Sequence, residues 1–306
     1  MPTVAILLCT YNGARFLPTQ LSSFADQTFA NWHLFVSDDG STDETLSILS
    51  RKRFKLGKAD VVIRDGPRRG FVRNFLSLAC DCSISSDYFA YSDQDDIWQP
   101  DKLSRAITWL DTMPPAYPAM YCSRSQLIDN DDRPCGFSPL FRRKPSFRNA
   151  LVQSIAGGNT IVFNKAARQL LVDCGSDVDV PLHDWWTYLL ITAAGGSVHY
   201  DPLPSVRYRG HSSNVVGTNV GWGSRLRRLQ MLKSGEFEHW SALNIAALER
   251  FLLHMTPENR FLFELFCESR KRGFFGRQFG FLRAGVYRQT LLGNMGLAVA
   301  VWAKRI

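Results

Sequence analysis

The 306 residues suffice to bury a hydrophobic core, and the length is typical of one α/β domain with an appendage or of two small domains. Apolar residues make up 45% and charged residues 21% of the sequence, which excludes a wholly disordered chain. The net charge of +8 favours anionic partners such as phosphorylated small molecules or acidic lipids, while nucleic acid is a minor alternative because no nucleic-acid-reading motif is found.

The cysteines and the apolar runs near both ends of the sequence indicate where the protein works. The seven cysteines are odd in number and mostly in apolar contexts, which favours a reducing compartment over a disulfide framework. No secretory signal is expected, because Met1 is not followed by a basic segment and the apolar run 4–9 is short. The apolar run 291–303 is shorter than the ~20 residues of a spanning helix. The sequence therefore predicts a cytoplasmic protein that does not cross a membrane.

The first hundred residues alternate short apolar runs with amphipathic stretches, which predicts repeated β-α units. The expected strands are 4–9, 32–37, 61–64 and 88–92, and the expected helices are 14–25, 42–53 and 71–79. Ser41 or Thr42 is expected to open the second helix. The pattern predicts a Rossmann-like α/β fold with a mostly parallel central sheet flanked by helices.

The rest of the chain is irregular at first and then helical. After the Pro-rich stretch 113–145, which holds a strand at 119–122, the sequence predicts strands at 160–163 and 198–200, a helix at 183–194 and a polar loop at 207–217. Basic amphipathic helices are expected at 225–232, 240–254 and 258–271.

The final segment, 273–306, interleaves aromatic residues with Arg277, Arg283 and Arg288, which suits either a membrane interface or a helical cap with a solvated basic face. These features predict a catalytic domain over 1–220 and a C-terminal helical extension over 221–306.

Three polar clusters follow predicted strands, at residues 10–13, 38–41 and 93–96. Because ligands bind beyond the carboxyl ends of parallel strands, these clusters are expected to meet at one edge of the sheet. The carboxylates of Asp93, Asp95 and Asp96 repel one another unless a cation neutralises them, and such hard oxygen ligands suit Mg²⁺ or Mn²⁺ bound to a diphosphate. The alternative is a solvated, Asp-rich turn.

Other polar residues in this half suit a nucleotide. Asp38 and Asp39 stand where a base or ribose would be bound, although they also suit capping of the next helix. Arginines at 68–73 precede a helix and could meet phosphate oxygens. No lysine-bearing P-loop and no G-x-G-x-x-G follows the first strand, which argues against ATP hydrolysis and against a dinucleotide dehydrogenase.

Taken together, these motifs resemble family 2 glycosyltransferases of the GT-A fold, and the wording of the later ones is similar to bacterial rhamnosyltransferases that build surface polysaccharides. The matching stretches are TYNG at 10–13, DDGSTD at 38–43, RGFVRNF at 69–75, SDQDDIWQPDKL at 92–103, AGGNTIVFN at 156–164, HDWW at 183–186 and YRGHSSNVVG at 208–217. The resemblance covers residues 1 to about 220.

The resemblance implies a role for each matching residue. It implies nucleotide or donor contacts for Thr10, Tyr11, Asn12, Asp38, Asp39, Arg69, Asn74, Asp93, Arg209 and His211, and metal binding for Asp95 and Asp96. Asp184 takes the place of the family's general base, with histidine at 183 where glutamate is usual, and a plain helix N-cap is its alternative. His183, Trp185 and Trp186 are expected to contact the acceptor or the sugar, because indole rings offer a flat apolar surface for stacking.

The implied reaction is inverting transfer of a sugar from a nucleotide-sugar, TDP-rhamnose first of all, to a glycan or lipid-linked saccharide in cell-surface polysaccharide synthesis. The implied cofactor is Mg²⁺ or Mn²⁺, and the implied location is the inner face of the cytoplasmic membrane, as a peripheral protein on an anionic surface. A sugar-nucleotide nucleotidyltransferase and an inactive nucleotide-sugar or lipid-binding module remain as alternatives.

Overall fold

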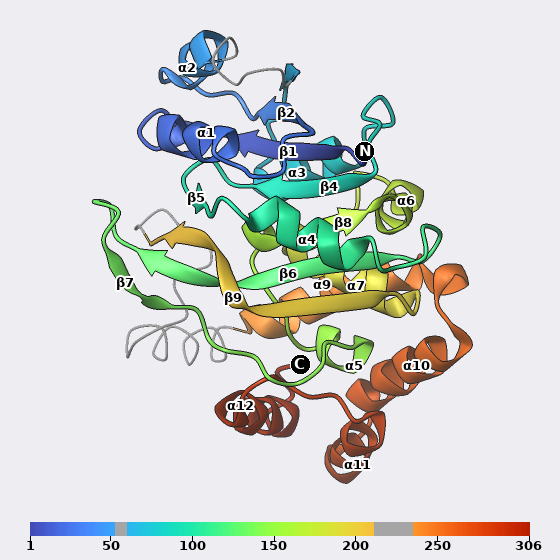
Figure 1. The fold of residues 1–306 in the computed structure, drawn as a ribbon. Helices are drawn as coiled ribbons and strands as arrows, with labels where there is room; N and C mark the ends of the chain where they lie inside the picture. The colour runs from blue at the N-terminus through green and yellow to red at the C-terminus, as the bar shows by residue number, and fades with distance from the viewer. Residues whose placement is uncertain (53–59, 211–234) are drawn as a thin grey trace.

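The computed structural model describes residues 1–52, 60–210 and 235–306, which fold around a nine-stranded sheet (Figure 1). The strand order is β3-β2-β1-β4-β8-β6-β9-β5, and β7 pairs with β6. Neighbours β3-β2-β1-β4 and the pair β6-β9 are parallel, whereas β8, β5 and β7 are antiparallel to their partners. The strands are β1 (Val4–Thr10), β2 (Trp32–Asp38), β3 (Val61–Asp65), β4 (Tyr88–Ser92), β5 (Ile97–Trp98), β6 (Ala119–Ile128), β7 (Pro134–Phe137), β8 (Val162–Asn164) and β9 (Ser197–Arg209).

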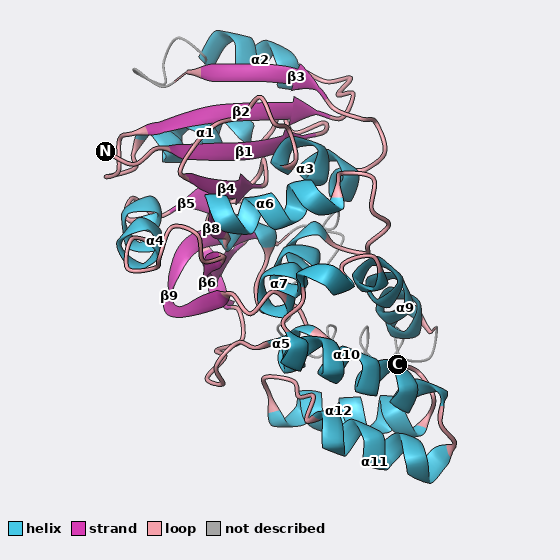
Figure 2. Cartoon of the chain, turned by 90° about the vertical axis from the view of Figure 1, so that its right-hand side faces the viewer, coloured by secondary structure: helices cyan, strands magenta, loops and turns pink. Residues whose placement is uncertain are grey.

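Helices cover both faces of the sheet (Figure 2). The helices of the first two hundred residues are α1 (Leu17–Ala25), α2 (Thr45–Lys52), α3 (Phe71–Ala79), α4 (Lys102–Leu110), α5 (Phe147–Ala150), α6 (Lys165–Cys174) and α7 (His183–Ala193). Apolar residues of α1, α2 and α4 bury one face, and those of α3, α6 and α7 bury the other. The predicted α/β class with a mostly parallel sheet is confirmed.

The central strand β1 shows why this sequence builds such a sheet. All seven of its residues are buried, and alternate side chains point to opposite faces. Ile6 packs in the core cluster with α1 and α4, whereas Ala5 and Leu7 pack in the cluster with α3 and α7. In register, Thr10 pairs with Asp38 on β2, and Leu8 pairs with Ser92 on β4. The polar residues that follow these three strands therefore emerge at one edge.

Two helices of the parallel half begin later than predicted, and two further helices were not predicted. Helix α1 begins at Leu17, because Pro18 suits only the first turn of a helix. Helix α2 begins at Thr45, and the carboxylate of Asp43, rather than Ser41 or Thr42, accepts from the Thr45 backbone N–H at 2.9 Å. The pattern missed α4 and α6 entirely.

The second half of the sheet also differs from its prediction. Strands β6 and β9 are longer than expected, so the segment 207–209, predicted as a loop, is strand. Strand β8 and helix α7 lie within one or two residues of their predicted bounds.

The C-terminal helices are α9 (Glu236–Glu249), α10 (Pro257–Lys271), α11 (Phe274–Ala284) and α12 (Leu291–Trp302). They share a core with the sheet, because Leu248, Phe266 and Phe281 join the same buried cluster as Trp186 of α7. The helix predicted at 225–232 and the boundary predicted at 220 lie outside the described residues, so the division into domains stays a prediction. Within the described ranges, no helix has the length and apolarity needed to span a membrane.

Candidate active site

The loop after β1 is fixed by side chains from the other two loops at the sheet edge. The Gln94 side-chain amide pairs with the Tyr11 backbone, accepting from its N–H at 2.9 Å and donating to its carbonyl at 2.9 Å. Asn12 accepts from the Thr42 N–H at 2.8 Å and has a left-handed φ of 49°. The Tyr11 ring itself is 57% exposed. This leaves a flat aromatic surface at the edge, and nucleotide contacts by Tyr11 and Asn12 stay predictions.

Asp38 connects the end of β1 to the loop that follows β2. Its carboxylate accepts from the Thr10 hydroxyl at 2.7 Å, the Ser41 hydroxyl at 2.6 Å, the Ser41 N–H at 2.7 Å and the Gly40 N–H at 3.2 Å. Asp38 is only 3% exposed, so its four donors come from the protein and leave no room for a base or ribose. The prediction that Asp38 contacts the nucleotide is thereby corrected, whereas that for Thr10, also buried, stays a prediction.

Asp39 lies nearer the surface and holds the loop that precedes α3. Its two carboxylate oxygens accept from the backbone N–H groups of Arg68 at 2.6 Å and Gly70 at 2.8 Å. Arg69 on this loop is exposed and forms an ion pair with Asp177 at 3.0 Å. Nucleotide binding by Asp39 and Arg69 stays a prediction.

Asn74 was expected on the diphosphate side, but it is 2% exposed and faces β2. Its amide nitrogen donates to the Ser37 carbonyl at 2.9 Å, and its amide oxygen accepts from the Ser37 hydroxyl at 2.5 Å. Both polar ends are satisfied inside the fold, so Asn74 anchors α3 to β2 instead of reaching a ligand.

The acidic cluster after β4 contains two partly exposed carboxylates, Asp93 and Asp95, and one buried carboxylate, Asp96. Burial raises the pKa of Asp93 well above its usual range, and the like charges of Asp96, Asp95 and Asp184 raise it further. Asp184 is 91 residues away in sequence, so the effect of its charge on Asp93 indicates that the two carboxylates lie near each other.

Asp96 is not placed to bind a metal. It is fully buried, and its carboxylate accepts from the Asn159 side-chain amide and from the Arg209 backbone N–H at 3.0 Å. Burial and the charge of Asp95 raise the pKa of Asp96, against those two hydrogen bonds, which lower it. Asp96 therefore connects the acidic loop to two distant segments, which corrects its prediction as a metal ligand.

Asp184 lies in the first turn of α7, and a short turn links it to the acidic cluster. Its carboxylate accepts from the backbone N–H of Gly158 at 3.1 Å and of Trp185 at 2.6 Å. The next residue, Asn159, is the partner of Asp96. A Cβ at position 158 would lie 2.5 Å from the His183 ring, so only glycine permits this approach. The consecutive residues Gly158 and Asn159 thus connect Asp184 to Asp96 of the acidic cluster through hydrogen bonds.

Burial raises the pKa of Asp184 to about 6, although its backbone hydrogen bonds lower it. The Asp184 carboxylate is therefore mostly ionised only above that pH. If Asp184 is a general base, kcat at saturating donor and cation should rise about tenfold per pH unit below pH 6 and level off above it. A kcat that stays flat from pH 4.5 to 8 would contradict the assignment.

Lys102, at the start of α4, is a site residue that the sequence reasoning missed. Its side chain is fully buried, its ammonium donates to the Asn159 carbonyl at 2.8 Å, and it lies 4.0 Å from the Trp98 ring centroid. Burial lowers the pKa of Lys102 to about 7, while the charges of Asp96 and Asp93 raise it. A lysine six residues after the acidic cluster was the available signal, but α4 was not predicted, so nothing in the sequence indicated that this side chain is buried.

Arg209 at the end of β9 is 1% exposed and supports the backbone of the acidic loop. Its guanidinium donates to the carbonyls of Asp95 and Asp129, each at 2.9 Å, and pairs with the Asp132 carboxylate at 2.5 Å. It also lies 4.3 Å from the Phe16 ring centroid. The prediction that Arg209 contacts the donor is thereby corrected, and His211, for which the same contact is predicted, lies outside the described residues.

The aromatic residues of the HDWW motif are core residues. Trp185 and Trp186 are 5% and 1% exposed, and the Trp185 indole N–H donates to the Ala150 carbonyl at 2.7 Å. His183 is buried and stacks on Phe75, with ring centroids 3.9 Å apart, and burial lowers the pKa of His183 to about 3. Because every residue of α7 except Asp184 is buried, these rings stabilise the helix that carries Asp184, and the predicted acceptor or sugar contacts are corrected.

The partly exposed carboxylates of the acidic cluster fit a divalent cation that is also bound by the phosphates of the substrate. No group of three or more His, Cys, Asp or Glu side chains within the described ranges is arranged to enclose a metal ion. Mg²⁺ is usually held by one or two carboxylates together with substrate phosphates, and Asp95, with Asp93 beside it, offers such a set. Metal binding by Asp95 stays a prediction, as does the donor contact predicted for Asp93. A cation there would also relieve the repulsion that raises the pKa of Asp93.

Fold and site together define the class. A mostly parallel sheet with acidic loops at its carboxyl edge and a helical extension is the GT-A architecture of glycosyltransferases. The sequence model of glycosyl transferase family 2 matches residues 5–171, more than half of the chain, and the chain belongs to this family.

Individual relatives agree with this assignment. The chain is 29% identical to the dTDP-rhamnosyl transferase RfbG of Shigella flexneri over 243 residues, which cover 74% of this chain and 79% of RfbG. It is 28% identical over 286 residues to an uncharacterised glycosyltransferase of Rickettsia prowazekii, covering 89% of this chain and 81% of that protein.

Two solved structures share the fold at low identity. The crystal structure of S. aureus TarS 1–349 has a TM-score of 0.57 and 14% identity, covering 99% of this chain and 88% of that chain. The mannosyltransferase PcManGT of Pyrobaculum calidifontis, in complex with GDP-Man and Mn²⁺, has a TM-score of 0.53 and 18% identity, covering 99% and 87%.

Proposed function

We propose that the protein transfers L-rhamnose from TDP-rhamnose, with inversion, to a glycan or lipid-linked saccharide in cell-surface polysaccharide synthesis. The observation that carries the chemistry is the link from Asp96 through Asn159 and Gly158 to Asp184, which joins the acidic cluster to a partly exposed carboxylate on α7. The donor is supported by the name of the relative RfbG, and cation use by the Mn²⁺ in the PcManGT complex.

In this mechanism Asp184 takes the proton from the acceptor hydroxyl as its oxygen attacks the anomeric carbon from the face opposite the diphosphate. Its raised pKa leaves it ionised near neutral pH and basic enough to accept that proton. Asp93 and Asp95 would hold the divalent cation, whose positive charge neutralises the departing diphosphate. Lys102 donates to the Asn159 carbonyl, and the Asn159 side-chain amide donates to Asp96, so these two residues hold the acidic loop in position.

The two alternatives make different predictions for the same site. A nucleotidyltransferase would need a basic, glycine-rich loop after β1, whereas this loop carries Tyr11 and Asn12 held by Gln94 and Thr42. An inactive binding module would hold the nucleotide without any need for a cation or for Asp184. Both alternatives are tested by the same assay.

The test is a panel of nucleotide-sugars, including TDP-rhamnose, assayed for release of the nucleotide diphosphate with and without Mn²⁺ or Mg²⁺. We expect turnover of TDP-rhamnose that depends on the cation, and we expect Asp95→Ala to weaken cation-dependent donor binding at least tenfold. Asp101→Ala is the control, since Asp101 is an exposed carboxylate on the same segment. Equal donor binding by the Asp95 variant and the wild type, or turnover unaffected by EDTA, would refute the metal role.

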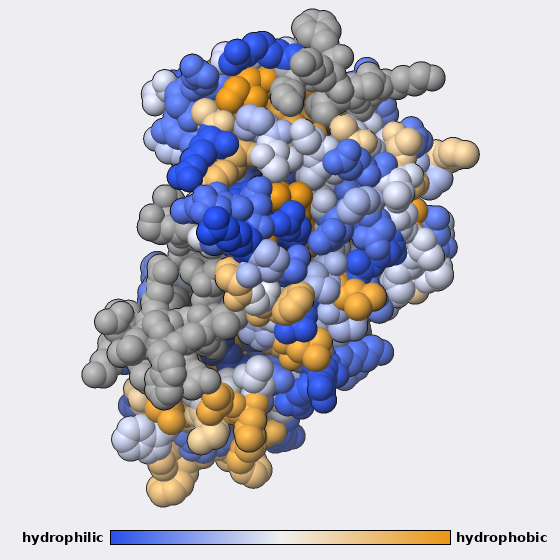
Figure 3. All heavy atoms as spheres, turned by 60° about the vertical axis from the view of Figure 1, so that its left-hand side comes forward, coloured by the Kyte–Doolittle hydropathy of each residue, from blue (hydrophilic) through white to orange (hydrophobic). Residues whose placement is uncertain are grey.

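We further propose that α11 and α12 attach the enzyme to the membrane surface. Figure 3 shows apolar side chains gathered over the end of the molecule that these helices form. On α11, Phe275, Phe279 and Leu282 are 84%, 66% and 79% exposed, and Leu291 and Trp302 of α12 are 79% and 63% exposed. So much exposed aromatic and aliphatic surface suits a bilayer interface. Of the arginines in this segment, Arg277 offers no exposed charge, because it is buried and donates to the Arg270 carbonyl, whereas Arg283 is exposed.

Removal of residues 273–306 would expose buried core, because Phe281 and Leu297 pack into it, so point substitutions make the sharper test. We expect Phe275→Ser, Phe279→Ser and Leu282→Ser together to abolish sedimentation with phosphatidylglycerol vesicles. The matched control replaces Leu203, Leu253 and Phe261, which are also exposed but lie elsewhere. Equal vesicle binding by the two triple variants would contradict the proposal. Added salt should weaken the vesicle binding to the extent that the anionic headgroups contribute to it.

A further inference from the structure

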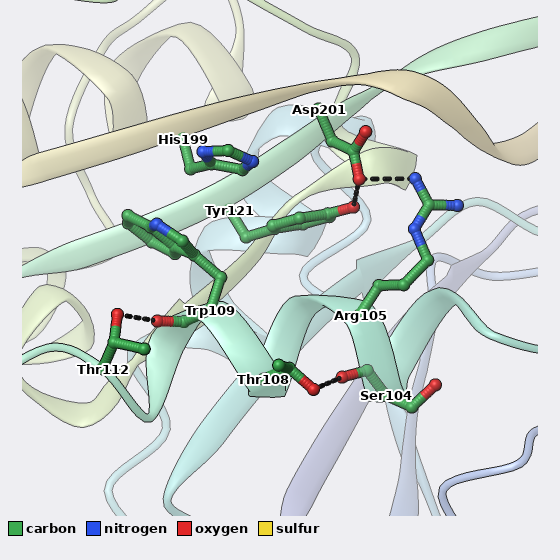
Figure 4. Close-up of a pocket in the computed structure, with 8 residues that line it drawn as sticks. All are labelled: Ser104, Arg105, Thr108, Trp109, Thr112, Tyr121, His199 and Asp201. Carbon is green, nitrogen blue, oxygen red and sulfur yellow. Dashed lines mark hydrogen bonds and ion pairs between the residues drawn. The ribbon is translucent and has the colours of Figure 1, made fainter.

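An open pocket lies between α4 and strands β6 and β9. Its volume is about 450 Å³, within the range of about 300–1,000 Å³ typical of small-ligand pockets. Figure 4 shows side chains from α4 facing those from the two strands across it. None of its lining residues belongs to the acidic cluster or contacts Asp184 in the described structure. We call it the α4–β9 pocket.

Aromatic rings line one side of this pocket. The His199 ring lies nearly parallel to Trp109, with centroids 5.2 Å apart, and to Tyr121, with centroids 5.6 Å apart. Tyr121 is buried, whereas Trp109 and His199 are partly exposed and offer their rings to the cavity. Among the described residues, no side chain is hydrogen-bonded to the Trp109 indole N–H or to the His199 ring nitrogens. The pocket thus combines flat apolar surface with unused polar atoms.

The charged groups of the pocket neutralise each other. Asp201 accepts from the Arg105 guanidinium at 2.5 Å and from the Tyr121 hydroxyl at 2.5 Å. Arg105 also donates to the carbonyls of Leu203 at 2.8 Å and Pro204 at 3.2 Å. An arginine so fully engaged, beside a carboxylate, does not favour a phosphate group. The chemistry therefore points away from a nucleotide and toward an uncharged ligand.

We infer that the α4–β9 pocket binds a neutral saccharide unit, as a second carbohydrate site apart from the active site. A sugar ring has apolar C–H faces that stack on aromatic rings and hydroxyls that pair with the unused nitrogens and with hydroxyl side chains such as that of Thr108. The inference rests on the proposed function, which supplies the ligand class as a part of the acceptor chain.

Helix α4 gives this site its relation to the chemistry. Lys102 at its start supports the acidic loop, and Trp109 is seven residues further along. At 1.5 Å per residue the two are separated by about 10 Å along the helix axis. A bound polysaccharide would therefore be held near the active site without occupying it, which would raise the local concentration of acceptor ends.

The test measures binding of neutral oligosaccharides of two to six residues, built from rhamnose, glucose, galactose or N-acetylglucosamine, by saturation-transfer NMR and calorimetry without donor. We expect at least one to bind, and Thr108→Trp to weaken that binding at least tenfold by filling the pocket from an exposed helix position. Trp109→Ala should weaken it similarly. The control is Ser47→Trp, because Ser47 is also exposed on a helix and bonded to its own helix backbone.

Absence of binding by the whole panel, or binding that Thr108→Trp leaves unchanged, would overturn the inference. So would UMP binding that Thr108→Trp removes, since this would make the pocket a nucleotide site. The donor assay separates the two proposals. Turnover of TDP-rhamnose with no Thr108-dependent saccharide binding refutes the pocket alone, whereas saccharide binding without any turnover refutes the proposed reaction alone.

Discussion

Asp184→Asn should reduce kcat by about 10²–10⁴-fold, the usual contribution of a general base, while donor affinity stays within a factor of two. The substitution keeps the shape of the side chain and one oxygen to accept from the Gly158 N–H, so the turn at 157–160 is preserved. The amide cannot take a proton from the acceptor. The measurement is single-turnover transfer alongside calorimetric titration of the donor with its cation.

Asp26→Asn is the control for this substitution, because Asp26 is exposed at the end of α1 and away from the site. It should leave both kcat and donor affinity unchanged. Full transfer by Asp184→Asn would remove Asp184 from the chemistry, whereas a large loss of donor affinity would make it a binding residue instead.

Lys102→Met should destabilise the protein by about 3–5 kcal/mol, since it removes a buried positive charge that interacts with the carboxylates of Asp96 and Asp93. The methionine keeps apolar contact with Trp98 but cannot donate to the Asn159 carbonyl, which then loses its buried donor. Transfer should fall as well, because Asn159 and the neighbouring Gly158 position Asp96 and Asp184. Urea unfolding measures the free energy, and single-turnover assays measure the transfer.

A double-substitution cycle separates charge from packing. Adding Asp96→Asn to Lys102→Met removes the unpaired charge, so part of the lost stability should return, and the two effects should not be additive. Lys271→Met, at an exposed lysine of α10, is the matched control and should change stability by less than about 0.5 kcal/mol. Wild-type stability in Lys102→Met would show that Asp96 does not need this cation.

The parallel half of the sheet could be predicted because its strands are buried on both faces. Such strands read as continuous apolar runs, and in β1 every residue from Val4 to Thr10 is buried. Because these strands are parallel, the polar residues that follow them all lie at the carboxyl edge of the sheet. In the second half this logic failed, because β9 is interrupted by prolines at 202 and 204, and its register with β6 shifts nearby, between Ser123 and Ser125.

Positions were easier to predict than roles. The resemblance located Asp184 and the acidic cluster, but it could not tell which side chains face a ligand and which face the core. Trp185 and Trp186 are buried because neighbouring elements cover every residue of α7 except Asp184, and a motif of four residues does not show this tertiary packing. Likewise Arg209 is turned inward by Asp129 and Asp132, which lie far from it in sequence.

The pairing between Gln94 and Tyr11 has an evolutionary consequence. Among the described residues, the amide of Gln94 bonds to main-chain atoms of Tyr11, so the loop conformation does not depend on the side chain at position 11. The exposed ring at this position is therefore free to vary between related proteins, whereas a change at Gln94 would disturb the loop itself. Gly13 is constrained by the same amide, since a Cβ there would lie 2.1 Å from the Gln94 side-chain oxygen.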